Sequence, residues 1–415
     1  EIMAEVATLK EQFEEAKAKN LALDMTRGKP GSEQLDLTLP MLDLVTSSDY
    51  KTAAGADSRN YGGLDGIPEA KELFKDFLEV SSTNEVVVGG NSSLTLMHDT
   101  IARCLSHGNS SSSIPWGKLD KVKFLCPSPG YDRHFAICEH FGIEMITVEN
   151  KDNDLDIEKI EELVAGDDSI KGIWVVPKYG NPTGTSVSDD VVQRLAKMNA
   201  AANDFRIFWD NAYTVHHLSD DIDVIENIFD ACKSAGNPDR VFILGSTSKI
   251  TFAGAGIAAI GGSESNMNWI RKQLSISTIG PDKINQVRHM RFFGDFSGLK
   301  EHMKKHALLI QPKFEVVNSI LENRLGGKGL ASWTNPKGGY FISLDTNEGC
   351  AKRVVALAAE AGVKLTAAGA TFPYKNDPRD TNIRLAPTLP SIEEIQQAMD
   401  IVCLCIEIAD SEKNA

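Results

Sequence analysis

Short apolar runs alternate with amphipathic stretches through most of the chain. Each run is rich in β-branched and aromatic residues, and most are followed by a stretch whose apolar residues recur with helical spacing. Short buried strands separated by helices are typical of a mostly parallel sheet with helices on both faces. The sequence therefore predicts an α/β fold with a mostly parallel seven-stranded sheet, whose strands fall within 85–90, 121–127, 143–149, 171–177, 205–213, 240–245 and 255–263.

The pattern changes near residue 300. A long helical stretch is followed by two short strands, a helix, another strand and a terminal helix, at 297–325, 333–345, 350–362, 382–387 and 391–409. A chain of 415 residues is too long for one ordinary core. We expect a large domain at 49–300 and a smaller α+β domain at 301–415, to which an N-terminal segment, 1–48, contributes.

Composition and charge limit the classes of partner. Hydrophobic residues make up 42% and charged residues 24%, which is the balance of a soluble globular protein. The formal net charge of −15 would repel nucleic acid and anionic membranes. We therefore expect no nucleic-acid and no membrane partner. Small anionic substrates require basic residues to converge locally.

Cysteine usage and the N-terminal residues bear on the compartment. The seven cysteines are odd in number and include no CxxC pair, so they predict reduced thiols and neither a disulfide framework nor a metal site. Residues 1–20 are charged and helical in period, without the apolar core of a signal peptide, and no apolar run is long enough to span a bilayer. The expected location is the cytoplasm. The serine-rich stretch 109–115 is expected to be a surface loop.

Polar residues collect in the loops that follow the predicted strands. In a parallel sheet the binding site lies beyond the carboxyl ends of the strands. Asp210 ends one strand in "FWDNAY", with Tyr213 shortly after it, and Asn181 lies in the turn "YGNPTG". Tyr131 and His134 share the loop "PSPGYDRHF". Each loop alone is a weak signal, but together they predict a binding site at this edge.

Two further stretches add a phosphate site and a reactive amine to this edge. "GGNSSL" precedes a helix, so backbone N–H groups and the helix dipole at Gly90, Asn91 and Ser92 favour a phosphate. Lys249 lies in "GSTSK", directly after an apolar run. Burial disfavours the charged form of an ammonium group. Lys249 is therefore either a solvated loop lysine or a reactive amine whose partners come from the other loops.

The motifs "NPTG" at 181–184, "DNAY" at 210–213 and "STSK" at 246–249 occur in one order. With them the chain resembles, from "RGKPG" to "IRLAP", the fold-type I pyridoxal-phosphate aminotransferases of class I/II, which are aspartate aminotransferase-like. The resemblance implies the PLP-dependent transferase fold and pyridoxal 5'-phosphate as cofactor. It implies that Lys249 forms the Schiff base with the cofactor and then, as a free amine, shuttles the substrate Cα proton.

The resemblance also implies roles for the residues around Lys249. Asp210 would keep the pyridine nitrogen protonated, unless it is a helix N-cap. Tyr213 and Asn181 would hydrogen-bond the phenolic oxygen, unless they only shape turns. Tyr131 would stack on the ring and His134 would support Asp210; a core aromatic residue and a satisfied histidine are the alternatives. The phosphate cup would combine Gly90, Asn91 and Ser92 with Ser246 and Ser248.

One part of the implied site requires a second subunit. Tyr61 in "RNYGGLDG" matches the family's tyrosine that reaches the phosphate of the neighbouring chain, so a homodimer with shared sites is expected. Many family members pair the phosphate with an arginine at the position of Ile257, and the loss of a charged partner in a dry site is expensive. Lys283 is our candidate for the missing charge, with a solvated loop lysine as the alternative.

Substrate recognition rests on four residues besides Asn181. Arg384 in "NIRLAP" matches the arginine that grips the substrate α-carboxylate, and Gly28 in "RGKPG" matches a glycine that lets the backbone approach the substrate. Arg27 and Lys29 flank Gly28 and could neutralise a side-chain carboxylate. Aspartate or glutamate as donor and 2-oxoglutarate as acceptor are therefore expected, with aromatic and alanine-type donors left open.

Two other functions fit the same resemblance. One is a different reaction of the cofactor, such as β-elimination or decarboxylation. The other is a non-catalytic ligand sensor, as in transcription regulators that join this fold to a DNA-binding domain. No basic helix-turn-helix segment precedes "RGKPG" in this sequence, which favours the enzyme.

Overall fold

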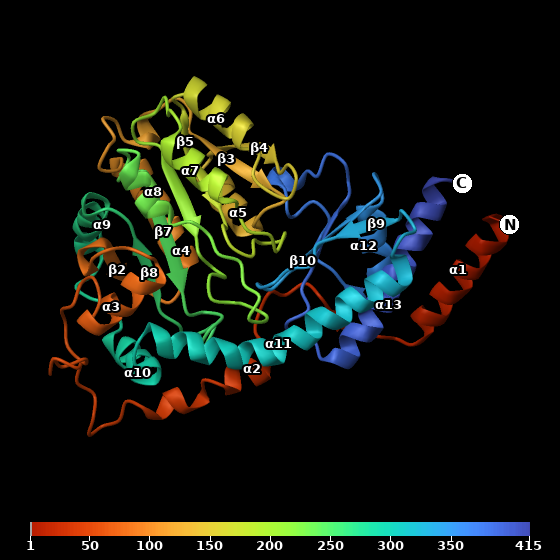
Figure 1. The fold of residues 1–415 in the computed structure, drawn as a ribbon, viewed down its shortest axis with the longest axis horizontal. Coiled ribbons are helices and arrows are strands. Elements are labelled where there is room, and N and C mark those ends of the chain that lie inside the picture. Colours follow the sequence, from red (N-terminus) through yellow and green to blue (C-terminus); the bar gives the residue numbers. More distant parts are fainter. Residues whose placement is uncertain (1) are drawn as a thin grey trace.

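A twisted seven-stranded sheet forms the larger part of the protein, described here by a computed structural model of residues 2–415 (Figure 1). Its strand order is β2-β8-β7-β6-β5-β3-β4. β8 runs antiparallel to both of its neighbours, and the other pairs are parallel. The predicted fold class is confirmed. The strands are β2 (Val86–Val88), β3 (Lys123–Ser128), β4 (Glu144–Glu149), β5 (Ile170–Val175), β6 (Arg206–Asp210), β7 (Val241–Ser246) and β8 (Ala258–Gly261).

Helices cover both faces of this sheet because adjacent residues of each strand point to opposite sides. Ile207 belongs to a core cluster with residues of α3, α6, α7 and α8, while its neighbour Phe208 belongs to a cluster with residues of α4, α5 and α9. Both faces of the seven-stranded sheet are therefore shielded from water. The helices are α3 (Pro68–Phe77), α4 (Ser93–His107), α5 (Asp132–His140), α6 (Ile157–Gly166), α7 (Asp189–Lys197), α8 (Ile228–Ser234) and α9 (Glu264–Ser277).

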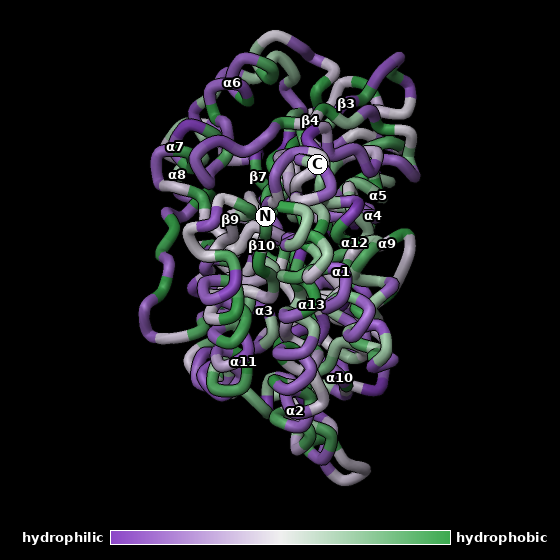
Figure 2. Tube along the Cα trace, turned by 90° about the vertical axis from the view of Figure 1, so that its right-hand side faces the viewer, coloured by the Kyte–Doolittle hydropathy of each residue, from purple (hydrophilic) through white to green (hydrophobic). Residues whose placement is uncertain are grey.

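The smaller part is built on an antiparallel sheet with the order β12-β10-β9. Both chain ends lie in this part, and α1, α11 and α13 run side by side there (Figure 2). The N-terminal strand β1 pairs with β11, which ties the start of the chain to this part. The elements are α1 (Ile2–Ala18), β1 (Leu23–Asp24), β9 (Ala331–Trp333), β10 (Ile342–Thr346), α12 (Ala351–Glu360), β11 (Val363–Lys364), β12 (Asn382–Leu385) and α13 (Ile392–Lys413).

One long helix, α11 (Phe296–Leu325), joins the two parts (Figure 1). Leu299 belongs to the core of the larger part, whereas Phe314 and Leu321 belong to the core of the smaller one. The predicted boundary at residue 300 thus falls inside a continuous helix whose apolar side serves two cores. The remaining elements are α2 (Ser32–Asp36), α10 (Lys283–Phe293) and four 3₁₀ turns: η1 (Leu39–Asp43), η2 (Thr83–Glu85), η3 (Trp116–Lys118) and η4 (Pro373–Lys375).

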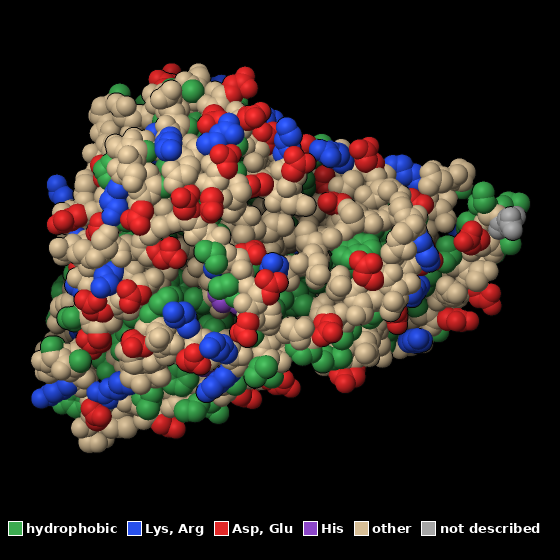
Figure 3. Space-filling model, in the orientation of Figure 1, with side chains coloured by type: hydrophobic (Ala, Val, Ile, Leu, Met, Phe, Trp, Pro, Cys, Tyr) green, Lys and Arg blue, Asp and Glu red, His purple; other side chains and the backbone are tan. Residues whose placement is uncertain are grey.

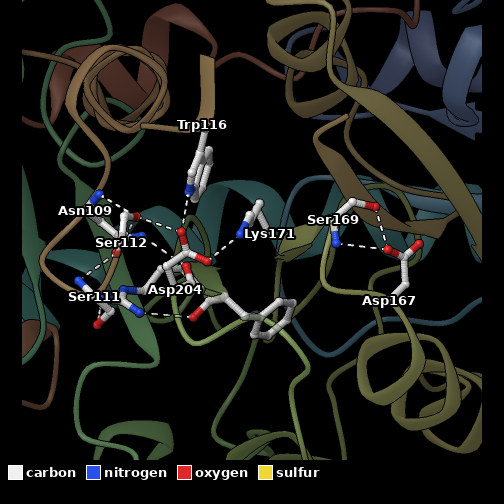
Figure 4. A network of polar contacts seen from close by, with 10 residues as sticks. Asn109, Ser111, Ser112, Trp116, Asp167, Ser169, Lys171 and Asp204 are labelled. Carbon is white, nitrogen blue, oxygen red and sulfur yellow. Dashed lines mark hydrogen bonds and ion pairs between the residues drawn. The ribbon is translucent and has the colours of Figure 1, made fainter. Parts of the chain in front are cut away.

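A buried carboxylate anchors the serine-rich stretch 109–115 (Figure 4). Asp204 Oδ1 lies 2.7 Å from Lys171 Nζ, and Asp204 Oδ2 accepts hydrogen bonds from Trp116 Nε1 at 3.0 Å and Ser112 Oγ at 2.7 Å. The stretch is a loop, as predicted, but it is attached to the sheet at the amino-terminal ends of β5 and β6. This attachment leaves the carboxyl ends of the strands open for a site.

The surface carries charges of both signs, and the thiols lie inside the protein. Basic and acidic side chains are interspersed over the face shown in Figure 3. All seven cysteines are free and buried. Within residues 2–415, none of the helices combines the length and the apolar character that crossing a membrane requires.

Candidate active site

The residues predicted for the site follow the carboxyl ends of four strands. Asp210 is the last residue of β6, Lys249 follows β7, and Asn181 follows β5. Tyr131 and His134 follow β3, at the start of α5. Because parallel strands end at one edge, residues distant in sequence meet there.

Lys249 is enclosed by aromatic side chains. Its Nζ donates a hydrogen bond of 2.8 Å to the Tyr213 hydroxyl, and it lies 4.7 Å from the Tyr213 ring centroid and 5.6 Å from that of Tyr340. Burial lowers the pKa of Lys249 and the Arg384 charge adds to this, whereas Tyr131 and Asp210 oppose it. Lys249 is thus a partly buried amine held among aromatic side chains, with a lowered pKa, and not a solvated loop lysine.

Burial also keeps the two neighbouring phenols protonated. It raises the pKa of Tyr213 strongly and that of Tyr131 to about 12. The Tyr213 hydroxyl thus accepts from Lys249 as a neutral group and retains its own proton for donation.

Asp210 is a buried carboxylate with one oxygen held and the other open. Asp210 and His134 are 1% and 2% exposed, and His134 Nε2 lies 2.9 Å from Asp210 Oδ2. The His134 ring stacks on Trp174, with centroids 4.5 Å apart and planes 8° apart. Asp210 Oδ1 is buried without a hydrogen-bond partner. No helix begins at Asp210 in the described chain, because the next helix is α8, so the N-cap alternative is wrong.

Arg384 brings the smaller part of the protein to the same place. It lies on β12, and its Nη1 donates to Asn181 Oδ1 at 3.3 Å, while its Nη2 donates to the Thr26 carbonyl at 3.2 Å. The guanidinium lies 4.5 Å above the Phe341 ring. Arg384 Nε is buried without a partner. The guanidinium therefore has donor capacity left for an anion.

The segment between β1 and α2 passes this arginine at close range, with the Thr26 carbonyl bonded to Arg384. A Cβ at Gly28 would lie 2.1 Å from Phe341 Cζ, so only glycine fits there. Arg27 and Lys29 on either side are exposed.

Small residues line the space at the N-terminus of α4. Ser248 Oγ donates to the Asn91 carbonyl at 3.1 Å, and Ser246 Oγ to Ser248 Oγ at 3.2 Å. The Ser92 hydroxyl caps α4 by accepting from the Leu94 N–H. Gly90 has a φ of +73°, and a Cβ there would meet nothing within 4 Å. This open space beside a helix N-terminus suits a phosphate.

Three further positions bear on the charge of a bound phosphate. Ile257 is buried, and its N–H donates to Thr247 Oγ1 at 2.9 Å. Lys283 is the first residue of α10, not a loop residue, and its Nζ donates to the Gly62 carbonyl at 2.8 Å. Tyr61 is 81% exposed, on the loop between η1 and α3.

Comparison with known proteins identifies the family. A family model described as aspartate amino-transferase matches residues 1–415. The chain belongs to the aspartate aminotransferase family. An aspartate aminotransferase of Corynebacterium glutamicum is 48% identical over 407 residues, which cover 98% of this chain and 94% of that protein. This membership makes the chain an aminotransferase.

Solved structures agree with the fold of this aminotransferase. The crystal structure of an aspartate transaminase from Corynebacterium glutamicum has a TM-score of 0.97 at 48% identity and covers 100% of this chain and 97% of that one. An alpha-aminoadipate aminotransferase of Thermus thermophilus, complexed with N-(5'-phosphopyridoxyl)-L-leucine, has a TM-score of 0.76 at 17% identity. The match covers 94% of this chain and 93% of that one. The second likeness concerns the fold alone.

Sequence reasoning missed several side chains of the aminotransferase site. Tyr340 and Phe341 lie against Lys249 and Arg384, and the stretch "GGYF" that carries them was a usable signal. Asp132 Oδ1 lies 3.7 Å from Arg384 Nη1. Its position directly after Tyr131 was visible, but its pairing with an arginine of another domain was not.

The lowered pKa of Lys249 predicts its reactivity in the chain freed of bound cofactor. Only the unprotonated amine reacts with an acylating reagent, so a lowered pKa moves the midpoint of the labelling–pH curve to lower pH. Lys304 is the internal control, because its hydrogen bond with Glu301 raises its pKa. We expect peptide mass spectrometry to give a midpoint for Lys249 below that for Lys304. Equal midpoints, or the reverse order, would contradict the described environment of Lys249.

Proposed function

We propose that this aminotransferase uses pyridoxal 5'-phosphate at Lys249 to move the amino group of aspartate or glutamate to a 2-oxo acid such as 2-oxoglutarate. The observation that carries the proposal is a buried carboxyl group, Asp210, with an open oxygen at the same sheet edge as a partly buried amine of lowered pKa, Lys249. When bound, the cofactor supplies the electron sink that allows a substrate Cα–H bond to break.

The residues present fit this cofactor. Asp210 Oδ1 lacks a partner, and the N–H of a pyridinium ring is a donor of the kind it requires. Tyr213 and Asn181 have hydroxyl and amide donors for the phenolic oxygen, and the Tyr131 ring is a flat surface for stacking. Ser246, Ser248, Gly90, Asn91 and Ser92 would hold the phosphate around the N-terminus of α4.

The roles of the protein's own groups follow from their environments. Lys249 Nζ would hold the cofactor and, once released, would move the proton at the substrate Cα, which requires a free amine. Tyr213 orients that amine through its 2.8 Å contact. His134 Nε2 lies 2.9 Å from Asp210 Oδ2 and keeps the carboxyl group in place, with Oδ1 left open.

Arg384 is proposed to bind the substrate α-carboxylate. Its planar guanidinium is held by Asn181 and Thr26 and supported by Phe341, and its Nε still lacks an acceptor. A bidentate carboxylate contact suits this arrangement. An acidic donor is supported by the name of the Corynebacterium glutamicum relative.

We also propose a homodimer with shared sites. Tyr61 is 81% exposed and Ile276 89% exposed, and such apolar side chains are typical of a surface that another subunit covers. Lys283 Nζ donates a hydrogen bond to the carbonyl of Gly62, the residue after Tyr61. In a dimer the two residues would reach the neighbouring phosphate together and replace the charge absent at Ile257. The buried free thiols fit a reducing compartment such as the cytoplasm.

A donor screen with 2-oxoglutarate as acceptor tests the function directly. We expect glutamate to form with aspartate as donor, and we expect Lys249→Ala to abolish the reaction because the proton carrier is lost. Lys304→Ala, a change on the exposed side of α11, is the control and should leave the rate unaltered. Release of ammonia without glutamate would indicate β-elimination instead, and no product from any donor would refute the proposal.

The side-chain carboxylate of an acidic donor, here called the distal carboxylate, provides a second test. Arg384→Ala should lower kcat/KM for every donor by roughly a hundredfold, because all donors carry the α-carboxylate. Arg27 and Lys29 are exposed, so the charge that meets the distal carboxylate is worth about five- to tenfold. We expect Arg27→Ala or Lys29→Ala to reduce kcat/KM for aspartate and to spare alanine. Equal losses for both donors would show that neither residue reads the distal carboxylate.

A further inference from the structure

A buried glutamine lies between the substrate side of the site and the catalytic lysine. Gln34, on α2, is 2% exposed, and all polar atoms of its amide have partners. The Gly31 N–H donates to Gln34 Oε1 at 3.1 Å. Gln34 Nε2 donates to the Tyr340 hydroxyl at 2.9 Å and lies 3.1 Å from His306 Nδ1. The three partners come from the N-terminal segment, the loop before β10, and α11.

These contacts fix the direction of every hydrogen bond in the group. The Gly31 N–H can only donate, so the amide oxygen must face it and the amide nitrogen must face Tyr340 and His306. His306 Nδ1 is then an acceptor, and its ring proton lies on Nε2. Burial lowers the pKa of His306 to about 4, which agrees with a neutral ring. The Tyr340 hydroxyl accepts from Gln34 and has its proton free to donate.

Both oriented groups point their protons at the main chain of the lysine loop. The Tyr340 hydroxyl donates to the Lys249 carbonyl at 3.4 Å, and His306 Nε2 donates to the Ile250 carbonyl at 2.9 Å. His302 Nε2 also lies 3.0 Å from the Ile250 carbonyl. In the described chain the side chains that bond these two carbonyls all come from outside the 247–251 turn. The peptide units after Lys249 are therefore held by α11, Tyr340 and the N-terminal segment.

We propose that Gln34 is a positioning residue that holds the Lys249 main chain through Tyr340 and His306 and links it to the substrate-contacting segment at Gly28–Gly31. The inference rests on the proposed function in that Lys249 is taken as the proton carrier. A main-chain shift at Lys249 moves Nζ away from the Tyr213 hydroxyl, and small misplacements of a catalytic group are costly. A packing role for Gln34 would instead be satisfied by any side chain of equal volume.

Volume-matched variants separate the two roles. Gln34→Met keeps the length of the side chain and removes the amide, and Tyr340→Phe keeps the ring beside Lys249 and removes only the hydroxyl. In the purified holoenzyme we expect hydrogen–deuterium exchange of residues 247–253 to be about fivefold faster in Gln34→Met, because hydrogen bonds holding the loop are lost. Gln286→Met is the control: this glutamine is equally buried but bonds the main chain near Val88, away from the lysine loop.

Kinetics supply the second measurement. We expect kcat to fall about tenfold in Gln34→Met and about fivefold in Tyr340→Phe, with KM for the donor changed less than about twofold in Tyr340→Phe. The kcat of the double variant Gln34→Met/Tyr340→Phe should be at most about tenfold below that of the parent protein, because both changes break the same path to the Lys249 carbonyl. Gln286→Met should keep the parent's kcat and its exchange at 247–253.

The outcomes distinguish this inference from the proposed function. Unchanged exchange at 247–253 in Gln34→Met, or losses of kcat that multiply in the double variant, would overturn the positioning role. The exchange measurement needs no turnover, so it decides the inference even with an inactive preparation. Absence of transamination in the parent protein bears on the proposed function alone. If Gln34→Met fails to fold, Tyr340→Phe with unaltered exchange and kcat would still refute the proposal.

Discussion

The desolvation of one amine and one carboxylate is the constraint around which this protein is arranged. Lys249 and Asp210 carry opposite formal charges at one buried edge, yet they do not pair with each other. Lys249 bonds the Tyr213 hydroxyl, and Asp210 bonds His134. Each group is thus stabilised by a side chain of its own, while burial biases the amine toward its neutral form. One carboxylate oxygen remains unsatisfied. A ligand with an N–H donor for Asp210 Oδ1 and an electrophilic carbon for the Lys249 amine would satisfy both groups.

The fold meets this constraint by bringing two domains to one edge. The seven-stranded sheet supplies Asp210, Asn181 and the lysine loop, and β12 of the smaller sheet supplies Arg384, which bonds Asn181 across the junction. The helix α11 is shared by both cores, so its position relative to the large sheet is fixed by packing. His302 and His306 stand one turn apart on this helix and hold the Ile250 carbonyl. The lysine loop is therefore held by the element that joins the domains.

Local sequence patterns were sufficient to predict most of the fold, but they could not predict contacts between distant segments. Strands and helices were readable because alternation and helical spacing are local, and Asp210 and Lys249 were readable because polar residues directly after buried strands lie at the functional edge. The boundary predicted at residue 300 lies within α11, whose continuous apolar side packs into both cores, and the division into domains stays a prediction. The contacts among Gln34, Tyr340 and His306 could not be predicted, because the three residues are far apart in the sequence. The roles proposed for Tyr61 and Lys283 require a second subunit, which one sequence does not display.

The most direct measurement is to locate the covalent attachment point of the cofactor. Borohydride reduction of the purified protein converts a lysine-bound pyridoxal phosphate into a stable adduct, and peptide mass spectrometry then assigns it to one residue. We expect a phosphopyridoxyl group on Lys249 and on no other lysine of the chain. An adduct on another residue, such as Lys283, or a protein purified and reconstituted with pyridoxal phosphate that carries no adduct, would contradict it.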